Sequence, residues 1–453
     1  MTCAIDGGYN LAMRRPLARS RALELALLVS ISCAVPSFVL EACAPGEGPS
    51  IAVKREQLFT LGYGPAEDQL DLFQGNDSEA PQKTAIAMME GIFYISDGAG
   101  AKLVRFTSWG DPLSMLYNPE IDSAPILLKP VATPSISNSA GSMQAFPSGN
   151  DRSHPRGDAF GIGREAVPYP FRSLGAVAVD SNQTVYVEDR LPPERRVQDR
   201  DSGALLDHVV LRFDKNGQFM DFLGQEGIGG TPFPYILGVY TAGFEDCVVV
   251  SALQTGWLVH WFDDNGVLVN SIKLMRRDLP MPDKGPGLIA NFDKIVPDSS
   301  GRNILLKVDY YKAQDSADAS AAELTSSWTY RLDLKDGKYL DRWRIPVLAG
   351  SVKGPDGRSL KYSRTPELLG AAGRSLFFLY ADDDGRSFVS TFDRNSQASS
   401  RYRIDIAPDE LYYDSYFLSK DGVLCALLAS KSEAKIVWWR FDKLIDSNSG
   451  IVK

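Results

Sequence analysis

The sequence predicts an all-β fold, a six-bladed β-propeller, and three observations support this prediction. A motif recurs six times: a short apolar strand that ends in an aromatic residue or Leu, a polar turn, and a second apolar strand. Each copy follows a segment of two apolar strands around a turn. Units that each form one small sheet cannot bury their hydrophobic faces alone, so they must stack, and a closed ring of blades is the solution that we predict.

The last aromatic or Leu of each motif's first strand gives a fixed reference point along the repeats. These anchors are Phe106, Phe213, Phe262, Leu332, Phe392 and Phe441. Phe213 and Phe262 are 49 residues apart, as are Phe392 and Phe441, which is close to the ~40–50 residues of a propeller blade. Strand alternation puts the anchors on the same face as nearby apolar residues, so we expect them in the core between blades rather than stacked on a ligand.

A ring needs a closing strand, and the sequence offers two candidates for it. The segment QLFTLG at 57–62 resembles QFMDFLG at 218–224, which follows an anchor strand and is the expected outer strand of its blade. The last blade runs from Phe441 into the polar stretch DSNSG and lacks an evident outer strand of its own. We therefore predict that residues 57–62 complete the last blade, with Ile451-Val452-Lys453 as the rival, since closure removes the open edge.

The N-terminus reads as an export signal. Arg14, Arg15, Arg19 and Arg21 precede a mostly apolar stretch, Ala22 to Leu40, which is followed by Leu-Glu-Ala-Cys. This resembles a bacterial lipoprotein signal in which Cys43 becomes the lipidated first residue, although Glu41 departs from the usual small residue and Cys33 is a weaker candidate. The start could be Met1 or Met13. An uncleaved anchor and a simple signal peptide with a soluble product stay open as alternatives.

These features divide the chain into three parts. We expect residues 1–43 to form the signal, 44–55 (with APGEGPS) to form a flexible tether, and 56–453 to form the propeller. The stretch from about 118 to 171 is rich in Pro, Ser, Gly and Asn, which predicts a disordered insertion between blades. Long loops gathered on one face of a propeller are where binding would be placed.

Composition limits the possible partners and the redox chemistry. The chain has a formal net charge of −9, which disfavours nucleic acid and anionic headgroups as partners. Cys247 and Cys425 lie in apolar strand segments, so we expect buried free thiols rather than metal ligands or a disulfide.

The search for chemistry gives few candidates, and we predict no catalytic residue, no metal site and no cofactor. His154, His208 and His260 are the three histidines, and their spacing matches no zinc site. His154 lies in the predicted insertion. His260 alternates with Phe262 in a strand, and this position favours a role in packing over one in chemistry. The best acidic clusters are Glu188-Asp189 and Asp382-Asp383-Asp384, each at the end of a hairpin strand. Their carboxylates could hold Ca²⁺, but they lack the spacing of a calcium-binding loop.

The repeats resemble a known family. The segments VYVEDR and VVLRFDKNGQFMDFLG, with FYISDGAGAKLVRF and VHWFDDNGVLV, are similar to NHL-type repeats. The whole chain resembles an exported propeller lipoprotein family of spirochaetes whose function is unassigned. The resemblance implies a binding scaffold on a six-bladed ring. NHL-like propellers also include lactonases and lyases, but none of their metal or catalytic residues can be carried onto positions of this sequence.

Three functions follow as hypotheses. The first is a non-catalytic, lipid-anchored scaffold in the cell envelope that holds a protein or peptide partner. The second is a propeller hydrolase or lyase with a metal in the central channel, and the third is a receptor for a small ligand such as a sugar or peptide. We expect an exported protein, anchored by its lipid and facing the periplasm or the cell surface.

Overall fold

The computed structural model describes residues 50–72, 83–121, 125–131, 164–200, 202–243, 245–282, 287–299, 301–313, 322–353 and 359–448. Strands dominate these residues, and the single α-helix among them is α1 (Asp442–Asn448). Single 3₁₀ turns occur at Pro193–Arg195, Arg276–Asp278 and Pro408–Glu410. Within the described part of the chain, no helix is long and apolar enough to cross a membrane.

The strands form six sheets of at least four strands each. In five sheets the four innermost strands follow one another in chain order, and in the sixth a strand from the N-terminal part of the chain takes the fourth place. The first is β4 (Thr84–Met89), β5 (Ile92–Asp97), β6 (Lys102–Phe106), β7 (Pro112–Tyr117), β9 (Glu165–Pro168) and β8 (Lys129–Pro130). The second is β10 (Val177–Val179), β11 (Val185–Arg190), β14 (His208–Phe213), β15 (Phe219–Gly224) and β16 (Gly227–Ile228). The third is β17 (Ile236–Ala242), β18 (Asp246–Leu253), β19 (Gly256–Phe262) and β20 (Leu268–Met275).

The fourth sheet is β21 (Leu288–Pro297), β22 (Asn303–Ala313), β23 (Ala322–Asp333) and β24 (Lys338–Ile345). The fifth is β27 (Glu367–Ala372), β28 (Ser375–Ala381), β29 (Ser387–Asp393), β30 (Ser399–Ile404) and β1 (Ile51–Ala52). The sixth is β31 (Tyr413–Leu418), β32 (Val423–Ala429), β33 (Ala434–Arg440), β2 (Arg55–Tyr63) and β3 (Gln69–Leu70). Two hairpins stand apart from the sheets: β12 (Val197–Gln198) with β13 (Leu205–Leu206), and β25 (Leu348–Lys353) with β26 (Ser359–Arg364).

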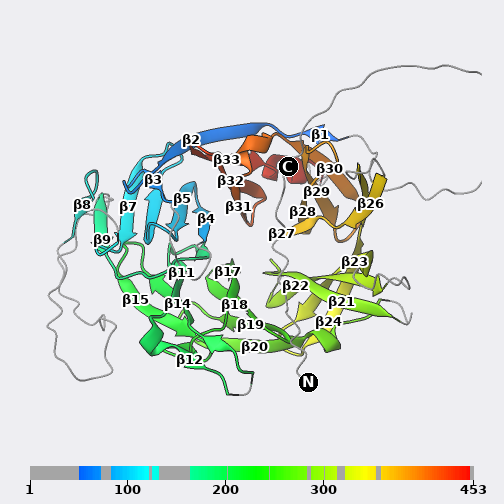
Figure 1. Cartoon of the computed structure of the whole chain (residues 1–453), viewed down its shortest axis with the longest axis horizontal. Helices are drawn as coiled ribbons and strands as arrows, with labels where there is room; N and C mark the ends of the chain where they lie inside the picture. Colours follow the sequence, from blue (N-terminus) through cyan, green and yellow to red (C-terminus); the bar gives the residue numbers. More distant parts are fainter. Residues whose placement is uncertain are drawn as a thin grey trace, which may run out of the picture. The chain divides into compact units, whose positions relative to one another are not determined.

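The inner strands of the sheets contact one another in chain order and close a ring (Figure 1). β4 contacts β10, and contacts continue through β17, β21, β27 and β31 back to β4. The predicted all-β propeller is therefore confirmed. One count of the blades gives five rather than the predicted six, whereas strand pairing separates six sheets, so we describe the ring by these six sheets.

The predicted anchors lie in the core. Phe106, Phe213, Phe262, Leu332 and Phe441 are each at most 1% exposed, and Phe392 is partly buried against the apolar cluster between the fourth and fifth sheets. The aromatic positions are thus used for packing between blades, as their strand period predicts.

The N-terminal strand closes the ring as predicted. β2 pairs antiparallel with β33 from Arg55 opposite Trp439 to Leu61 opposite Ala434, so it is the outer strand of the last blade. Phe59 on this strand packs against Phe93 and Phe106 of the first sheet, with ring centroids 5.7 and 5.4 Å apart. The strand therefore joins the last blade to the first. The rival segment 451–453 lies outside the described residues.

Two predicted boundaries need correction. Residues 51–52 of the expected tether 44–55 form β1, which pairs in parallel with Tyr402 and Arg403 of β30, and β2 already begins at Arg55. The expected disordered insertion 118–171 is ordered at its ends, because β9 pairs with β7 and β8 pairs with β9. Glu67 explains part of this order, since its Oε1 accepts hydrogen bonds from the backbone N–H groups of residues 127 and 128 at 2.7 and 3.2 Å.

The closing strand is also held by a buried carboxylate, Glu410. It accepts hydrogen bonds from Arg55 at 2.6 and 2.9 Å and from Lys435 at 3.0 Å. Burial alone would raise the pKa of Glu410, but the hydrogen bonds from Arg55, Lys435 and the Ala407 N–H outweigh it and lower the pKa from 4.5 to about 2.

We therefore predict an acid-dependent contribution from Glu410. Because the folded pKa lies below the unfolded one, its stabilisation is fully present above about pH 4.5 and is lost as the pH falls through about 2. A Glu410→Gln variant should unfold at lower urea concentration than the native chain at about pH 7, and the two should converge near about pH 2. A difference in urea midpoint that stays constant over this range would contradict the prediction.

The ring has two unlike faces. The starts of the inner strands lie together, because Lys83, just before β4, hydrogen-bonds Ile236 O at the start of β17 at 2.9 Å, and the Thr84 N–H donates to Tyr413 Oη at the start of β31 at 2.9 Å. Successive strands of an antiparallel blade alternate in direction, so the connection between the second and third strands lies on the same face as the start of the inner strand. The chain also leaves the outer strand on this face. We call it the long-loop face and the opposite one the short-turn face.

The long connections begin and end at strand ends on the long-loop face. They join β2 to β4, β7 to β10, β11 to β14, β15 to β17, β20 to β21, β22 to β23, β24 to β27 and β30 to β31. By contrast, the turns within blades on the short-turn face, such as 107–111 and 263–267, have at most five residues. This asymmetry agrees with the expectation that insertions gather on one side of the ring.

Candidate functional site

The long-loop face carries a buried ion cluster where the first three blades meet. Glu188, at the end of β11, is 2% exposed. Lys83 donates to its two oxygens at 3.1 and 3.3 Å, and the backbone N–H of Ala176 donates at 2.9 Å. Because Lys83 also donates to Ile236 O at 2.9 Å, the cluster connects strands of three successive blades.

His208 completes this cluster. Its Nδ1 lies 3.0 Å from Glu188 Oε1 and its Nε2 lies 3.4 Å from Asp207 Oδ1. The Nδ1 contact does not meet hydrogen-bond geometry, so we treat it as an electrostatic contact. Arg190 also pairs with Asp207 at 2.6 Å. The structure thus brings together two of the residues that the sequence singled out, Glu188 and His208.

The pKa values of the two neighbouring carboxylates of this strand, Glu188 and Asp189, are shifted in opposite directions. Burial would raise the pKa of Glu188, but the contacts with His208 and Lys83 outweigh it and lower the pKa. Burial raises the pKa of Asp189 to about 6, although it accepts hydrogen bonds from the backbone N–H groups of Ser173, Arg172 and Arg190. Glu188 is therefore an ion-pair partner, and Asp189 is a backbone-capping carboxylate.

A second buried ion cluster joins the fourth and fifth blades. Lys307 on β22 is fully buried and donates to Asp293 at 2.9 Å, to Asp309 at 3.2 Å and to the Thr365 hydroxyl at 2.9 Å. Thr365 in turn donates to Asp309 at 2.9 Å. Burial raises the pKa of Asp293, and Lys307 opposes the rise. Through Thr365, which lies just before β27, the cluster connects the inner strand of the fifth blade to the fourth blade.

Neither cluster has the form of a metal or nucleophile site. In the described ranges, no group of three or more His, Cys, Asp or Glu side chains is placed to hold a metal ion. A lysine pairs with Glu188 in the first cluster and with Asp293 and Asp309 in the second, so the direct effect of both clusters is to hold blades together.

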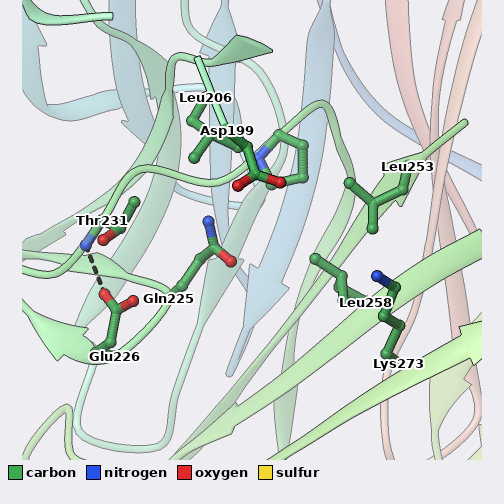
Figure 2. A pocket seen from close by; sticks show the side chains of 9 residues that line it. Asp199, Leu206, Gln225, Glu226, Thr231, Leu253, Leu258 and Lys273 are labelled. Atoms are coloured by element: carbon green, nitrogen blue, oxygen red, sulfur yellow. Dashed lines mark hydrogen bonds between the residues drawn. The ribbon is translucent and has the colours of Figure 1, made fainter. Parts of the chain in front are cut away.

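The long-loop face also carries a hollow of about 360 Å³ between the second and third blades. Figure 2 shows the side chains around it, with Glu226 and Thr231 on one side, Leu253, Leu258 and Lys273 on the other, and Gln225 between them. Asp199 and Leu206 come from the β12–β13 hairpin, and Pro234 precedes β17. Most of the residues around the hollow are polar, because two carboxylates, one ammonium, one amide and one hydroxyl lie beside three leucines and Pro234.

The other residues that the sequence singled out contribute to turns, packing or ion pairs. Asp382 caps its turn and pairs with Arg386, and Asp383 accepts a hydrogen bond from the Tyr362 hydroxyl at 2.7 Å. His260 stacks on Phe262, and burial lowers its pKa to about 4. Both Cys247 and Cys425 are buried free thiols, as predicted, and burial raises the pKa of each. His154, Cys33 and Cys43 lie outside the described residues.

The sequence did not predict that Lys83 and Lys307 pair with buried carboxylates, and it did not predict the hollow. Lys83 lies 105 residues from Glu188, so nothing local marks the pair. Lys307 had a weak signal, since it stands inside the apolar strand ILLKV with Asp two positions later. A charge in such a strand is rarely buried unless it is paired.

Comparison of the chain with known proteins gives only weak structural similarities. No protein family and no curated protein matches it. Among solved structures it is similar to the Dos1 propeller, with 8% identity over 82% of each chain and a TM-score of 0.35. It is similar to the polysaccharide lyase Uly1, with 11% identity over 86% of this chain and 99% of that one and a TM-score of 0.39. It is also similar to Penicillium chrysogenum α-L-arabinanase complexed with arabinobiose, with 10% identity over 85% and 98% and a TM-score of 0.39.

Similarities this weak add nothing to what the strands of the chain itself show. The chain is a β-propeller protein, as its own strand pairing shows. The finer resemblance to NHL-type repeats stays an expectation, because no family matches.

Proposed function

We propose that this protein is a non-catalytic, lipid-anchored propeller of the cell envelope that holds a protein or peptide partner on its long-loop face. The observation that carries the proposal is that every connection of more than five residues between the described strands begins and ends on one face, while the turns of the other face have at most five residues. Loops of variable length on a rigid ring are the usual place for recognition.

Exposed apolar side chains on the same face support the proposal. Tyr235 and Tyr412 are 47% and 53% exposed, and Val197 and Leu205 of the β12–β13 hairpin are also exposed. Exposed tyrosine is a common anchor in protein interfaces. The acidic net charge of the chain favours a partner with basic segments over nucleic acid.

The anchored, exported location belongs to the same proposal and rests on the sequence of residues 1–43, ending at Cys43. The NHL-like and spirochaete resemblances are part of it as well. Intact mass spectrometry of the protein from a membrane fraction should give the mass of residues 43–453 plus a diacyl or triacyl group. An unmodified mass would overturn the anchor and leave the binding face untouched.

The alternative of a small-ligand receptor has one observation in its favour, the hollow between the second and third blades, whose volume of about 360 Å³ suits a small molecule. A hydrolase or lyase would require carboxylates or histidines that converge at the inner strand ends. The two ion clusters described above each contain a lysine that pairs with their carboxylates, and neither has its carboxylates at the inner strand ends.

The binding proposal predicts that one hairpin can be removed with loss of the partner and not of the fold. We expect replacement of residues 197–206 by two glycines to abolish capture of the main cross-linked protein from an envelope fraction. The circular dichroism spectrum should still be that of the folded ring, because β12 and β13 pair only with each other. The urea midpoint should fall only by the loss of Leu206, the buried side chain of the replaced segment as far as the structure describes it. A matched change, Val267→Gly on the short-turn face, should leave capture intact. Equal capture by both variants would contradict the proposal.

A further inference from the structure

Two of the six sheets end in an outer strand that no further strand covers. The other four sheets carry strands beyond their fourth one, namely β9 with β8, β16, β1 and β3, whereas the third and fourth sheets end at β20 and β24. Among the described residues, the backbones of β20 and β24 hydrogen-bond only to the neighbouring strand of their own sheet. An open edge of this kind can pair with a strand from another chain.

β24 is the more open of the two edges. Six of its eight residues are exposed, whereas only Ser271 and Lys273 are exposed in the eight residues of β20. Leu340 is the extra residue of a bulge, since Tyr339 pairs with Leu332 and Asp341 with Arg331. The regular part of the open edge is therefore 341–345.

The side chains of this edge are mostly basic, although the net charge of the chain is −9. β24 carries three cations, Lys338, Arg342 and Arg344, and one carboxylate, Asp341. Asp341 is already paired with Arg331 at 2.5 Å. No salt bridge joins Arg342 or Arg344 to a carboxylate in the part of the chain that the structure describes. Both arginines can therefore pair with carboxylates from outside.

The two arginines have the spacing of an extended partner. Because Arg342 and Arg344 are two residues apart on one strand, their side chains leave the same face of the sheet about 7 Å apart. The guanidinium group of Arg342 lies 5.1 Å from the centre of the Trp328 ring, and Arg344 is directly opposite Trp328. An added strand would have the same two-residue period, so carboxylates at alternate positions would match the two arginines.

We propose that the edge of β24 binds an extended segment of a partner protein that has carboxylates at alternate positions, and that this segment joins the fourth sheet as a further strand. Charges on an edge strand ordinarily prevent indiscriminate pairing. Because the unpaired charges on β24 have one sign, they repel a basic strand or the β24 of a second copy and attract an acidic strand. The edge lies on the outer rim, so the inference goes beyond the proposed function and depends on neither the long-loop face nor the anchor.

The test is fluorescence polarisation of the full-length protein in detergent with the labelled peptide Thr-Glu-Val-Glu-Val-Thr and its counterpart Thr-Lys-Val-Lys-Val-Thr. We expect the acidic peptide to bind at least about tenfold more tightly, and Arg344→Gln to weaken it about fivefold. In the double variant Arg342→Glu with Arg344→Glu the preference should reverse, which a misfolded protein would not show. Lys129→Glu, at an exposed cation of β8 in the first sheet, is the matched control and should change neither affinity.

Methylation of the peptide backbone separates strand addition from simple charge attraction. Only alternate residues of a strand direct their N–H groups to a given neighbour. Methylation of either the two glutamate or the two valine nitrogens should therefore abolish binding, and methylation of the other pair should leave it.

Four results would overturn the inference. These are no binding of the acidic peptide, equal binding of both peptides by the native protein, and equal effects of the two methylation patterns. The fourth is a native dimer in sedimentation equilibrium that separates in the double variant, because a second copy would then cover the edge.

Discussion

Truncation of Phe59 to Ala is expected to lower the free energy of unfolding by about 3–5 kcal/mol, the usual cost of removing a buried aromatic side chain. Phe59 is 8% exposed and contacts Phe93 and Phe106 of the first sheet, although its own strand, β2, belongs to the last. The cavity would therefore open at the seam where the two ends of the chain meet. Urea unfolding followed by circular dichroism measures the loss.

The neighbouring residue supplies the control. Thr60 is exposed on the opposite side of the same strand, so Thr60→Ala should change the free energy of unfolding by no more than about 0.5 kcal/mol. If Phe59→Ala and Thr60→Ala had equal effects, β2 would be a peripheral strand and not the closure of the ring.

Substitution of Lys307 by Met is expected to cost about 3–5 kcal/mol, because it leaves two carboxylates without their buried cation. Lys307 is fully buried, and Asp293 and Asp309 lie within 2.9 and 3.2 Å of its ammonium group. The side chains are similar in length, so the loss reports charge rather than packing.

The pH dependence of this loss has a definite sign. Without Lys307, burial raises the pKa of Asp293 further above its unfolded value, so the folded variant binds protons more tightly than the unfolded chain does. Its stability therefore falls as the pH rises, and the loss relative to the native chain should shrink toward about pH 4. Lys338→Met, at an exposed ion pair with Asp336 at 3.2 Å, should change stability by less than about 1 kcal/mol at every pH. A pH-independent loss would contradict the assignment.

The fold could be predicted because its signal is repeated and local. Each blade carries the same strand period and an aromatic or leucine anchor, and the segment 57–62 resembles the outer strand of another blade. Composition misled the prediction at two places. Residues 51–52 and 165–168 look like linker, yet they add edge strands to existing sheets, and such pairing depends on backbone groups rather than on side-chain composition.

The site was harder to predict because its parts are distant in sequence. Glu188 and His208 stand out locally as polar residues at strand ends, but their partner Lys83 comes from another blade. The hollow needs side chains from a hairpin, a loop and three strands, none of which has an unusual sequence. Only the arrangement of blades brings them together.

Position-specific photo-cross-linking in intact cells tests the central claim, a partner held on the long-loop face, most directly. A photoreactive amino acid would replace Tyr235 or Leu205 on that face, and Trp109 or Val267 at the turns of the short-turn side, all of which are exposed. The account predicts a discrete higher-mass adduct from Tyr235 and Leu205 and none of that mass from Trp109 and Val267. The same adduct from the short-turn positions alone, or from neither set, would contradict it.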